Sequence, residues 1–324
     1  MTAFLIRRLG QSALVLLAMS ILVFVGVYAI GNPVDILINP QADQNERARV
    51  IAALGLDRPL WMQYFYFLGN ALQGDLGNSF TYNAPALSLV LERLPATLEL
   101  AFCAMLIAVL IGIPLGLWAG LRPRSLTARA IMGGSILGFS LPTFWVGMLL
   151  IMLFAVHLGC LPAGGRGPTQ EVLGIPFSFL STEGLAHLAL PALNLALFKL
   201  SLLIRLTRAG TQDALQQDYV RTARSKGLKE TRVVGVHVLR NILLPIITVT
   251  GLEFGSLIAF AIVTETLFAW PGMGKLIIDA IGVLDRPLIV AYLLVTVLLF
   301  TVINLVVDLL YGLLDPRVRA GDSQ

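Results

Sequence analysis

Long runs of apolar residues, separated by shorter polar stretches, make up most of the chain. Six of these runs are long enough for a helix to cross the hydrocarbon core of a bilayer, which takes about 20 residues. They are residues 9–30, 97–121, 130–156, 186–204, 241–266 and 289–312. The pattern therefore predicts an all-α polytopic membrane protein with six transmembrane helices.

The first apolar run has features that a signal peptide would share. It follows two basic residues, Arg7 and Arg8, as the apolar region of a signal peptide does. Its length of 22 residues, however, exceeds the usual length of such a region. No pair of small residues spaced for cleavage follows it. We therefore expect this run to remain as the first membrane span.

Composition agrees with a membrane protein and excludes an ordinary soluble domain. Apolar residues make up 57% of the chain and charged residues only 13%, and the mean hydropathy is +0.83. The net charge of +4 would favour acidic partners in a soluble protein. Here the basic residues are explained by membrane topology, so we expect no binding to nucleic acid.

The distribution of basic residues predicts the topology. With the N-terminus inside, the cytoplasmic segments are 1–8, 122–129, 205–240 and 313–324. These segments contain 15 of the 23 Lys and Arg residues. The outer segments, which contain 7, are 31–95, 157–185 and 267–288. Because basic residues collect on the cytoplasmic side, both termini are predicted to be cytoplasmic.

The segment 31–95 is the longest water-facing piece of the chain. Amphipathic patterns predict helices at Asn45–Leu54 and Pro59–Leu72. The second helix concentrates aromatic residues, namely Trp61, Tyr64, Phe65, Tyr66 and Phe67. These residues suit either a belt at the membrane interface or a docking platform for an extracytoplasmic partner. Both interpretations remain open.

Prolines and small residues interrupt several spans. The prolines are Pro114, Pro142, Pro191 and Pro245. They fit either a transporter with moving helices or kinks that serve packing alone. The small residues of the third and fifth spans are Gly133, Gly134, Ser135, Gly138, Gly251, Gly255, Ser256 and Ala259. They predict close helix packing, and in a transporter they can also line a path.

Ionisable residues within the spans need a reason, since charge is costly in hydrocarbon. Glu99 is expected in the first turn of the second span, where the helix dipole favours a carboxylate. Glu265 and Asp308 lie near span ends, within reach of polar surroundings. Lys199 can extend its amine to the inner interface, or it can pair with Glu253.

Glu253 lies midway along the fifth run, near the bilayer centre. One interpretation is a structural carboxylate, paired across helices or protonated. The other is a polar group in a translocation path, where it could meet a substrate amine. Gly255 and Ser256 are the neighbouring candidates for such a path, and the two interpretations remain open.

The most charged part of the chain is the stretch 218–245, which must lie in water between two spans. Leu215, Tyr219 and Ala223 share one helical face, and the pattern stops at Gly227, a residue that ends helices in a left-handed turn. A second helical stretch begins near Glu230 and continues toward residue 241. The sequence predicts a helix, a glycine corner and another helix.

Several chemistries lack the residues that they need. No phosphate-binding G-x-x-x-x-G-K-[ST] loop occurs, so the chain is not expected to hydrolyse ATP or to be an enzyme. His157, His187 and His237 are scattered, without metal-ligand spacing, so no metal site is expected. Cys103 and Cys160 lie in different parts of the chain and are expected to be unpaired.

The charged stretch resembles the cytoplasmic coupling loop of membrane subunits of binding-protein-dependent ABC importers. Ala223 and Gly227 match that family's short signature, and YVRTARSKGL at 219–228 with LRNILLP at 239–245 resembles its dipeptide, oligopeptide and nickel branch. Further matching stretches are ERLPATLEL at 92–100, LPTFWVGMLL at 141–150, LGCLPAGG at 158–165, HLALPAL at 187–193, ETLFAWPGMG at 265–274 and LLYGLLDPRVR at 309–319. The resemblance thus extends over nearly the whole chain.

This resemblance implies a type I ABC importer permease fold and a set of partners. A second homologous permease forms the path, two ATP-binding subunits use ATP and Mg²⁺ in the cytoplasm, and an extracytoplasmic binding protein delivers the substrate. This chain itself would bind no cofactor and would contact membrane lipid. The residues implied in ATPase coupling are Tyr219, Arg221, Thr222, Ala223, Arg224, Lys226, Gly227 and Leu228.

On this basis the chain divides into four parts. Residues 1–30 form the N-terminal segment and first span, 31–95 the extracytoplasmic segment, and 315–324 a cytoplasmic tail. Between them, 96–314 form the permease core of five spans, which contains the coupling loop 205–240.

The implied location is the inner membrane of a prokaryotic cell, and di- or oligopeptides are the expected substrates. Nickel chelates, glutathione and other small solutes stay open. The alternative from another class is a stand-alone secondary carrier or channel that uses Glu253 at midplane. Such carriers often contain inverted repeats, and none is visible in this sequence.

Overall fold

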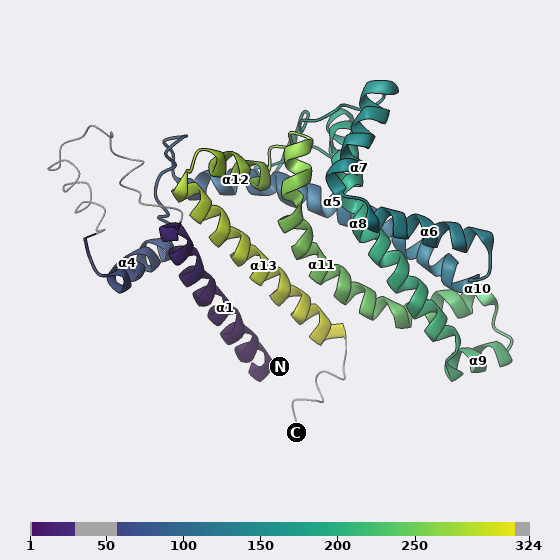
Figure 1. Ribbon diagram of the computed structural model, residues 1–324. Helices are drawn as coiled ribbons and strands as arrows, with labels where there is room; N and C mark the ends of the chain where they lie inside the picture. Colours follow the sequence, from purple (N-terminus) through teal and green to yellow (C-terminus); the bar gives the residue numbers. More distant parts are fainter. Residues whose placement is uncertain (1, 30–56, 315–324) are drawn as a thin grey trace. The chain divides into compact units, whose positions relative to one another are not determined.

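The computed structural model describes residues 2–29 and 57–314 (Figure 1). The predicted helix Asn45–Leu54 and the predicted tail 315–324 lie outside the described residues. The chain divides into two compact units. The first contains Arg93–Leu276 and the chain from Val302 onward, and the second contains Thr2–Glu92 and Ile277–Thr301.

Within the described residues, five helical stretches are long and apolar enough to cross a membrane. Four are single helices: α1 (Thr2–Ala29), α5 (Ala86–Leu121), α8 (Thr182–Leu215) and α13 (Arg286–Leu314). The fifth is the continuous stretch Glu230–Leu267. A sixth span results if a bent helix pair counts as one, which agrees with the six predicted runs.

That bent pair corrects the prediction for residues 130–156. Instead of one continuous helix, the chain forms α6 (Leu126–Ser140) and then α7 (Thr143–Leu150), which continues into the π-helical stretch η1 (Ile151–His157). The two parts meet at an angle of 108°. Pro142 explains the break, because it lacks an N–H and forces the preceding residue, Leu141, out of the helical region, to φ −85° and ψ 137°.

The second predicted span is longer than expected. Helix α5 begins at Ala86, so Glu99 lies more than three turns from its start and not in the first turn. The helix dipole therefore does not account for this carboxylate. Pro95 and Pro114 both lie inside α5, as Pro191 lies inside α8.

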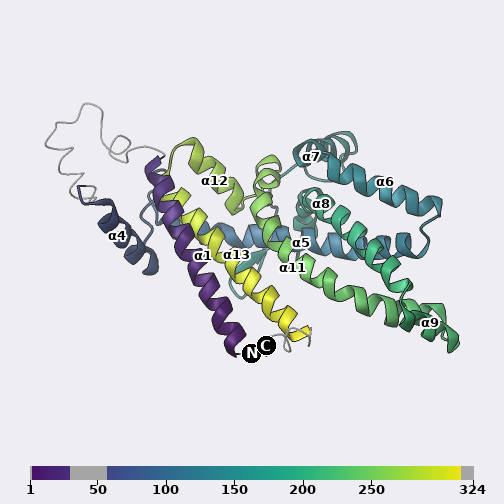
Figure 2. The same ribbon diagram turned by 60° about the horizontal axis from the view of Figure 1, so that its bottom comes forward.

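In the first unit, α8 packs against α6, α7 and α11 (Leu239–Leu267), as Figure 2 shows for α6 and α11. A glycine face of α5 lets it approach α8 closely. A Cβ at Gly112 would lie 3.0 Å from Leu203 Cβ, and one at Gly120 would lie 2.6 Å from Thr211 Cβ. Gly116 lies between these two, so the three glycines are spaced about one turn apart and form a stripe of the kind that brings membrane helices together.

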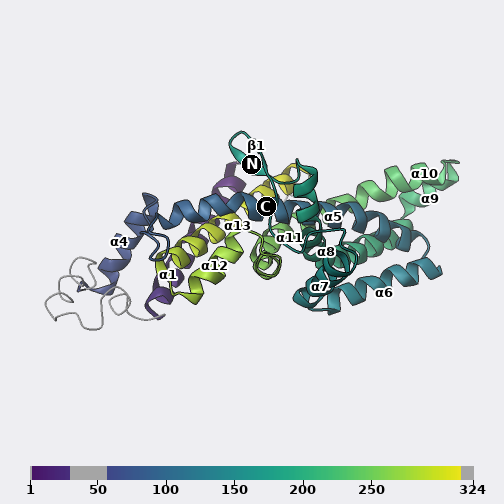
Figure 3. The same cartoon turned by 90° about the horizontal axis from the view of Figure 1, so that it is seen from above.

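The connection between η1 and α8 contains a short antiparallel hairpin, β1 (Gln170–Val172) and β2 (Ile175–Phe177). At the other end of α8 lie two short helices, α9 (Asp218–Ser225) and α10 (Glu230–Arg232), next to each other in Figure 3. The π-helical stretch η2 (Val233–Val238) joins α10 to α11.

In the second unit, the predicted aromatic helix is confirmed as α4 (Leu60–Leu72). It packs on α1, where Tyr64 shares a hydrogen bond of 2.8 Å with Ser20 and its ring meets Phe24 edge-on at 5.4 Å. Trp61 and Phe65 remain exposed. The belt and docking interpretations both remain predictions. Helix α12 (Met273–Gly282) begins in the first unit and ends in the second.

The close approach of α5 to α8 predicts that Gly116→Ala destabilises the protein. Its Cβ would lie 2.6 Å from the Ile204 carbonyl oxygen and 2.7 Å from Thr207 Cβ, so backbone must move, at a cost of about 1–3 kcal/mol. Gly134→Ala is the matched control, since no atom lies within 4 Å of its Cβ. Thermal unfolding in detergent should show a lower midpoint for Gly116→Ala only. Equal midpoints would contradict the tight packing.

The predicted topology can be checked with the native cysteines. Both are free, Cys160 is exposed, and Cys103 is partly covered within α5. A membrane-impermeant thiol reagent added outside should label Cys160 and should not label a Ser225→Cys variant in intact cells. Labelling of residue 225 from outside would show that the orientation is inverted.

Candidate coupling loop and polar clusters

The predicted helix–glycine–helix is confirmed between α8 and α11. Gln217 is extended, at φ −73° and ψ 148°, and separates α8 from α9. This break corrects the predicted face, because the helical register of Leu215 does not continue into α9. Val220 and Ala223 are buried, whereas Tyr219 is 37% exposed.

Gly227 ends α9 in the way that the sequence predicts. Its φ is +75°, in the left-handed region that favours glycine. The Gly227 N–H donates to the Arg224 carbonyl at 2.9 Å, and the Leu228 N–H donates to the Ala223 carbonyl at 3.4 Å. These bonds satisfy carbonyls that the helix end leaves free. A Cβ at this position would meet no atom within 4 Å, so the corner is open to a partner.

An ion pair spans this corner. Arg224 Nε and Nη2 donate to the two carboxylate oxygens of Glu230 at 2.8 and 3.2 Å. Sequence reasoning did not assign a role to Glu230. The sequence does contain a signal for this ion pair, because a basic residue, Arg224, precedes Gly227 and an acidic residue, Glu230, follows it. The forked geometry fixes α9 against α10 more strictly than a single contact would.

The other coupling candidates form the surface of the same corner. Tyr219, Arg221, Thr222, Arg224 and Lys226 are exposed, and Leu228 is half-buried. Ala223 is buried, so it supports the corner from within. The corner thus presents basic and hydroxyl side chains on a short, folded element.

The second half of the corner is continuous with a membrane span. Helical structure extends from Glu230 to Leu267, through α10, η2 and α11, although the sequence suggested a separate loop helix and span. At a rise of about 1.5 Å per residue, roughly 35 Å of helix separates Glu230 from Glu253. One continuous helical element, which includes the π-helical stretch η2 and has Pro245 inside α11, therefore links the corner to Glu253.

At midspan the structure pairs Glu253 with Lys199, across α11 and α8. Lys199 Nζ donates to Glu253 Oε2 and, at 2.7 Å, to Ser256 Oγ. Ser256 Oγ in turn donates to Glu253 Oε2 at 2.9 Å. The Lys199 side chain is 5% exposed and that of Glu253 is 30% exposed. Gly255 is buried and does not share this surface.

Two further carboxylates are held inside the first unit. Glu265 is fully buried and accepts from Thr97 Oγ1 at 2.7 Å and from the Lys275 N–H at 3.0 Å. Glu99 Oε2 accepts from Arg166 Nη2 at 2.6 Å, and its Oε1 accepts from the Ser178 N–H at 2.6 Å. Thus Glu99 ties the connection between η1 and α8 to α5. No role was predicted for Arg166, because its partner is distant in the chain.

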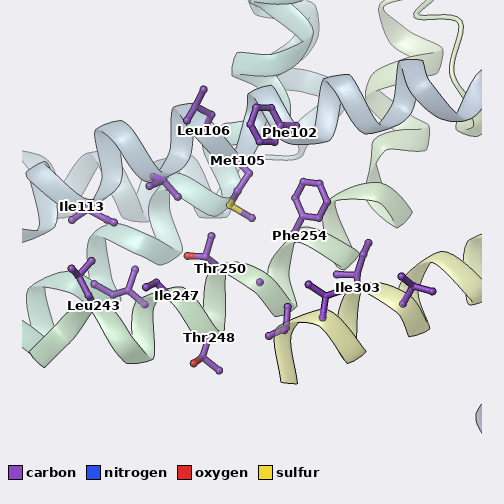
Figure 4. Close-up of a pocket in the computed structure, with 16 residues that line it drawn as sticks. Phe102, Met105, Leu106, Ile113, Leu243, Ile247, Thr248, Thr250, Phe254 and Ile303 are labelled. Atoms are coloured by element: carbon purple, nitrogen blue, oxygen red, sulfur yellow. The ribbon is translucent and has the colours of Figure 1, made fainter. Parts of the chain in front are cut away.

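A cavity of about 580 Å³ lies between α5, α11 and the end of α13 (Figure 4). Phe102, Met105 and Phe254 are among its 16 lining residues, nearly all of which are apolar. The hydroxyl-bearing residues in its wall are Thr248 and Thr250. Such a wall does not suit a charged solute. The polar cluster around Glu253 is the better candidate for contact with one.

Comparisons with known proteins agree with these features. The sequence pattern of the family described as "Binding-protein-dependent transport system inner membrane component" matches residues 112–320. Its N-terminal counterpart matches residues 1–101. The chain belongs to this family.

Relatives of this inner membrane component align over almost their full length. The dipeptide transport system permease protein DppB of Escherichia coli strain K12 is 39% identical, over 98% of this chain and 99% of its own. The di/tripeptide permease protein DppB of Pseudomonas aeruginosa is 41% identical over 98% and 99%. The oligopeptide permease protein AppB of Bacillus subtilis is also 41% identical, over 98% and 100%.

A solved structure supports the permease fold. The MetNI methionine ABC transporter, in an inward-facing conformation, matches with a TM-score of 0.53 at 14% identity. The match covers 70% of this chain and 96% of that chain. The fold is that of an ABC transporter membrane component. Membership in this family favours an importer subunit over a stand-alone carrier.

The burial of Glu99 predicts that its loss destabilises the permease. Glu99→Ala would leave Arg166, whose side chain is 12% exposed, without its counter-charge, at a cost of about 3–5 kcal/mol. The double variant Glu99→Gln/Arg166→Gln removes both charges and should be milder. The measurement is the midpoint of thermal unfolding of the purified protein. A single variant as stable as the wild type would show that the pair does not hold the connection between η1 and α8.

Proposed function

We propose that this permease pairs with a second, homologous permease to form an ATP-driven path for peptides. Two ATP-binding subunits, which use ATP and Mg²⁺, dock on the cytoplasmic corner around Gly227. An extracytoplasmic binding protein delivers the substrate, and both termini of this chain are cytoplasmic. The observation that carries the proposal is the continuous helix from the corner to Glu253.

This helix supplies what coupling needs. An ATPase that closes in the cytoplasm has to move groups at membrane depth, and a stiff helix transmits such a displacement. The Gly227 turn and the Arg224–Glu230 ion pair hold α9 and α10 in a fixed shape that a partner surface can grip. The exposed residues on it, with Ala223 as support, form the proposed ATPase contact.

Peptides are the proposed substrates because of the relatives. Their names assign them to dipeptide, di/tripeptide and oligopeptide transport. A relative from Escherichia coli that is 38% identical is a glutathione permease. All these solutes have peptide bonds or charged end groups. Glu253 and Ser256, with Gly255 as a packing residue, form the proposed polar part of the path.

The decisive variant is Gly227→Val in the complete transporter. A β-branched residue at φ +75° is strained by about 1 kcal/mol or more, and its side chain points into the space proposed for the ATPase. We expect normal insertion, with loss of the ATPase or of uptake, and a smaller effect for Gly227→Ala. The measurements are peptide uptake and co-purification of the ATP-binding subunits.

Ser225→Ala is the control in the same corner, because Ser225 lies on the exposed surface and its hydroxyl donates to the Thr222 carbonyl of its own helix at 3.0 Å. It should transport normally. Uptake at the wild-type rate by the valine variant would remove Gly227 from the coupling contact.

A further inference from the structure

The two residues of the midspan ion pair, Lys199 and Glu253, differ in exposure. This difference suggests a role beyond holding helices together. Lys199 is almost enclosed, but nearly a third of the Glu253 side chain is uncovered. A buried pair stabilises a fold little compared with apolar residues of the same size. Stability alone therefore does not explain why charge is placed here.

Part of the α11 surface near Glu253 is not covered by the described part of the chain, although Leu257, one turn further along, is buried. Leu252 is 47% exposed, Val263 is 43% exposed and Phe260 is 69% exposed. An exposed carboxylate at this depth cannot face hydrocarbon, since charge there is costly. In the assembled transporter this surface must meet water or another polypeptide, as the wall of a path does.

The two oxygens of Glu253 also differ. Oε2 accepts from Lys199 and from Ser256. No hydrogen bond to Oε1 is formed by the described residues, and 30% of the Glu253 side chain is exposed. A carboxylate oxygen with free lone pairs is a site for a cationic donor.

We propose that Glu253 Oε1 accepts the N-terminal ammonium group of a peptide as it passes through the membrane, and this rests on the proposed function. Lys199 is a positioning residue, which holds Oε2 through its ammonium group and leaves Oε1 available to a second donor. Because Lys199 already balances the charge of Glu253, the peptide would be held weakly. Weak holding suits a site that substrates must leave.

A charge exchange within the pair separates this proposal from a structural role. The double variant Lys199→Glu/Glu253→Lys keeps the ion pair but presents a cation on the uncovered side, which repels an ammonium group. We expect peptide uptake by the complete transporter in proteoliposomes to fall by about tenfold or more, as for a lost charge-assisted contact. Uptake at the wild-type rate would overturn the proposal and leave a structural pair.

A second variant covers the case in which the exchanged pair does not assemble. Lys199→Met/Glu253→Gln removes both charges and leaves no buried ion unpaired, and it should also lower uptake. Normal uptake would overturn the proposal. Thr248→Val on the same helix is the control, because Thr248 bonds to the Leu244 carbonyl and lines the apolar cavity.

The wild-type transporter provides an independent measurement. A dipeptide without lysine and its N-acetyl form are compared, with the binding protein loaded to equal occupancy by each. We expect acetylation, which removes the ammonium group, to lower uptake per loaded binding protein by about tenfold. Equal uptake of the two forms would overturn the proposal. Failure of the proposed function would look different, because the wild type would then show no ATP-dependent peptide uptake.

Discussion

Ionisable side chains within the spans of this permease must find partners in the protein, because hydrocarbon offers no water to solvate them. Glu99, Glu253 and Glu265 meet this constraint in three places and with different donors. Arg166 and backbone N–H groups hold Glu99, Lys199 and a serine hold Glu253, and a threonine and an N–H group hold Glu265. Each set joins segments that are far apart in sequence.

These pairings position the elements that the proposed function uses. Glu99 fixes the connection between η1 and α8 to α5, and Lys199 fixes α8 to α11 at midspan. Below that pair, α11 continues without interruption through η2 and α10 to the corner at Gly227. The corner, the midspan cluster and the α8 contact therefore belong to one mechanically connected part of the first unit. The proposed coupling between an ATPase and a path rests on this connection.

Apolar packing has a different role in this protein. Lipid tails are as apolar as leucine, so helices associate where small residues allow close approach. The glycine face of α5 does this against α8, whereas Gly133 and Gly134 of α6 meet no atom within 4 Å of a Cβ. Glycine content alone therefore does not identify a packing face. The cavity beside Phe254 shows that neighbouring apolar surfaces also leave space.

The class of fold, the apolar spans and the helix end at Gly227 could be predicted from the sequence, because length, hydropathy and a left-handed turn are local properties. The motifs were also enough to indicate the family. The three-dimensional arrangement was needed to show that Lys199 pairs with Glu253, that Arg166 reaches Glu99 and that α9 buries Val220 in place of Tyr219. It was also needed to show that α6 and α7 meet at 108°. Such features depend on which helices meet and in what rotation, and one-dimensional spacing does not contain that information.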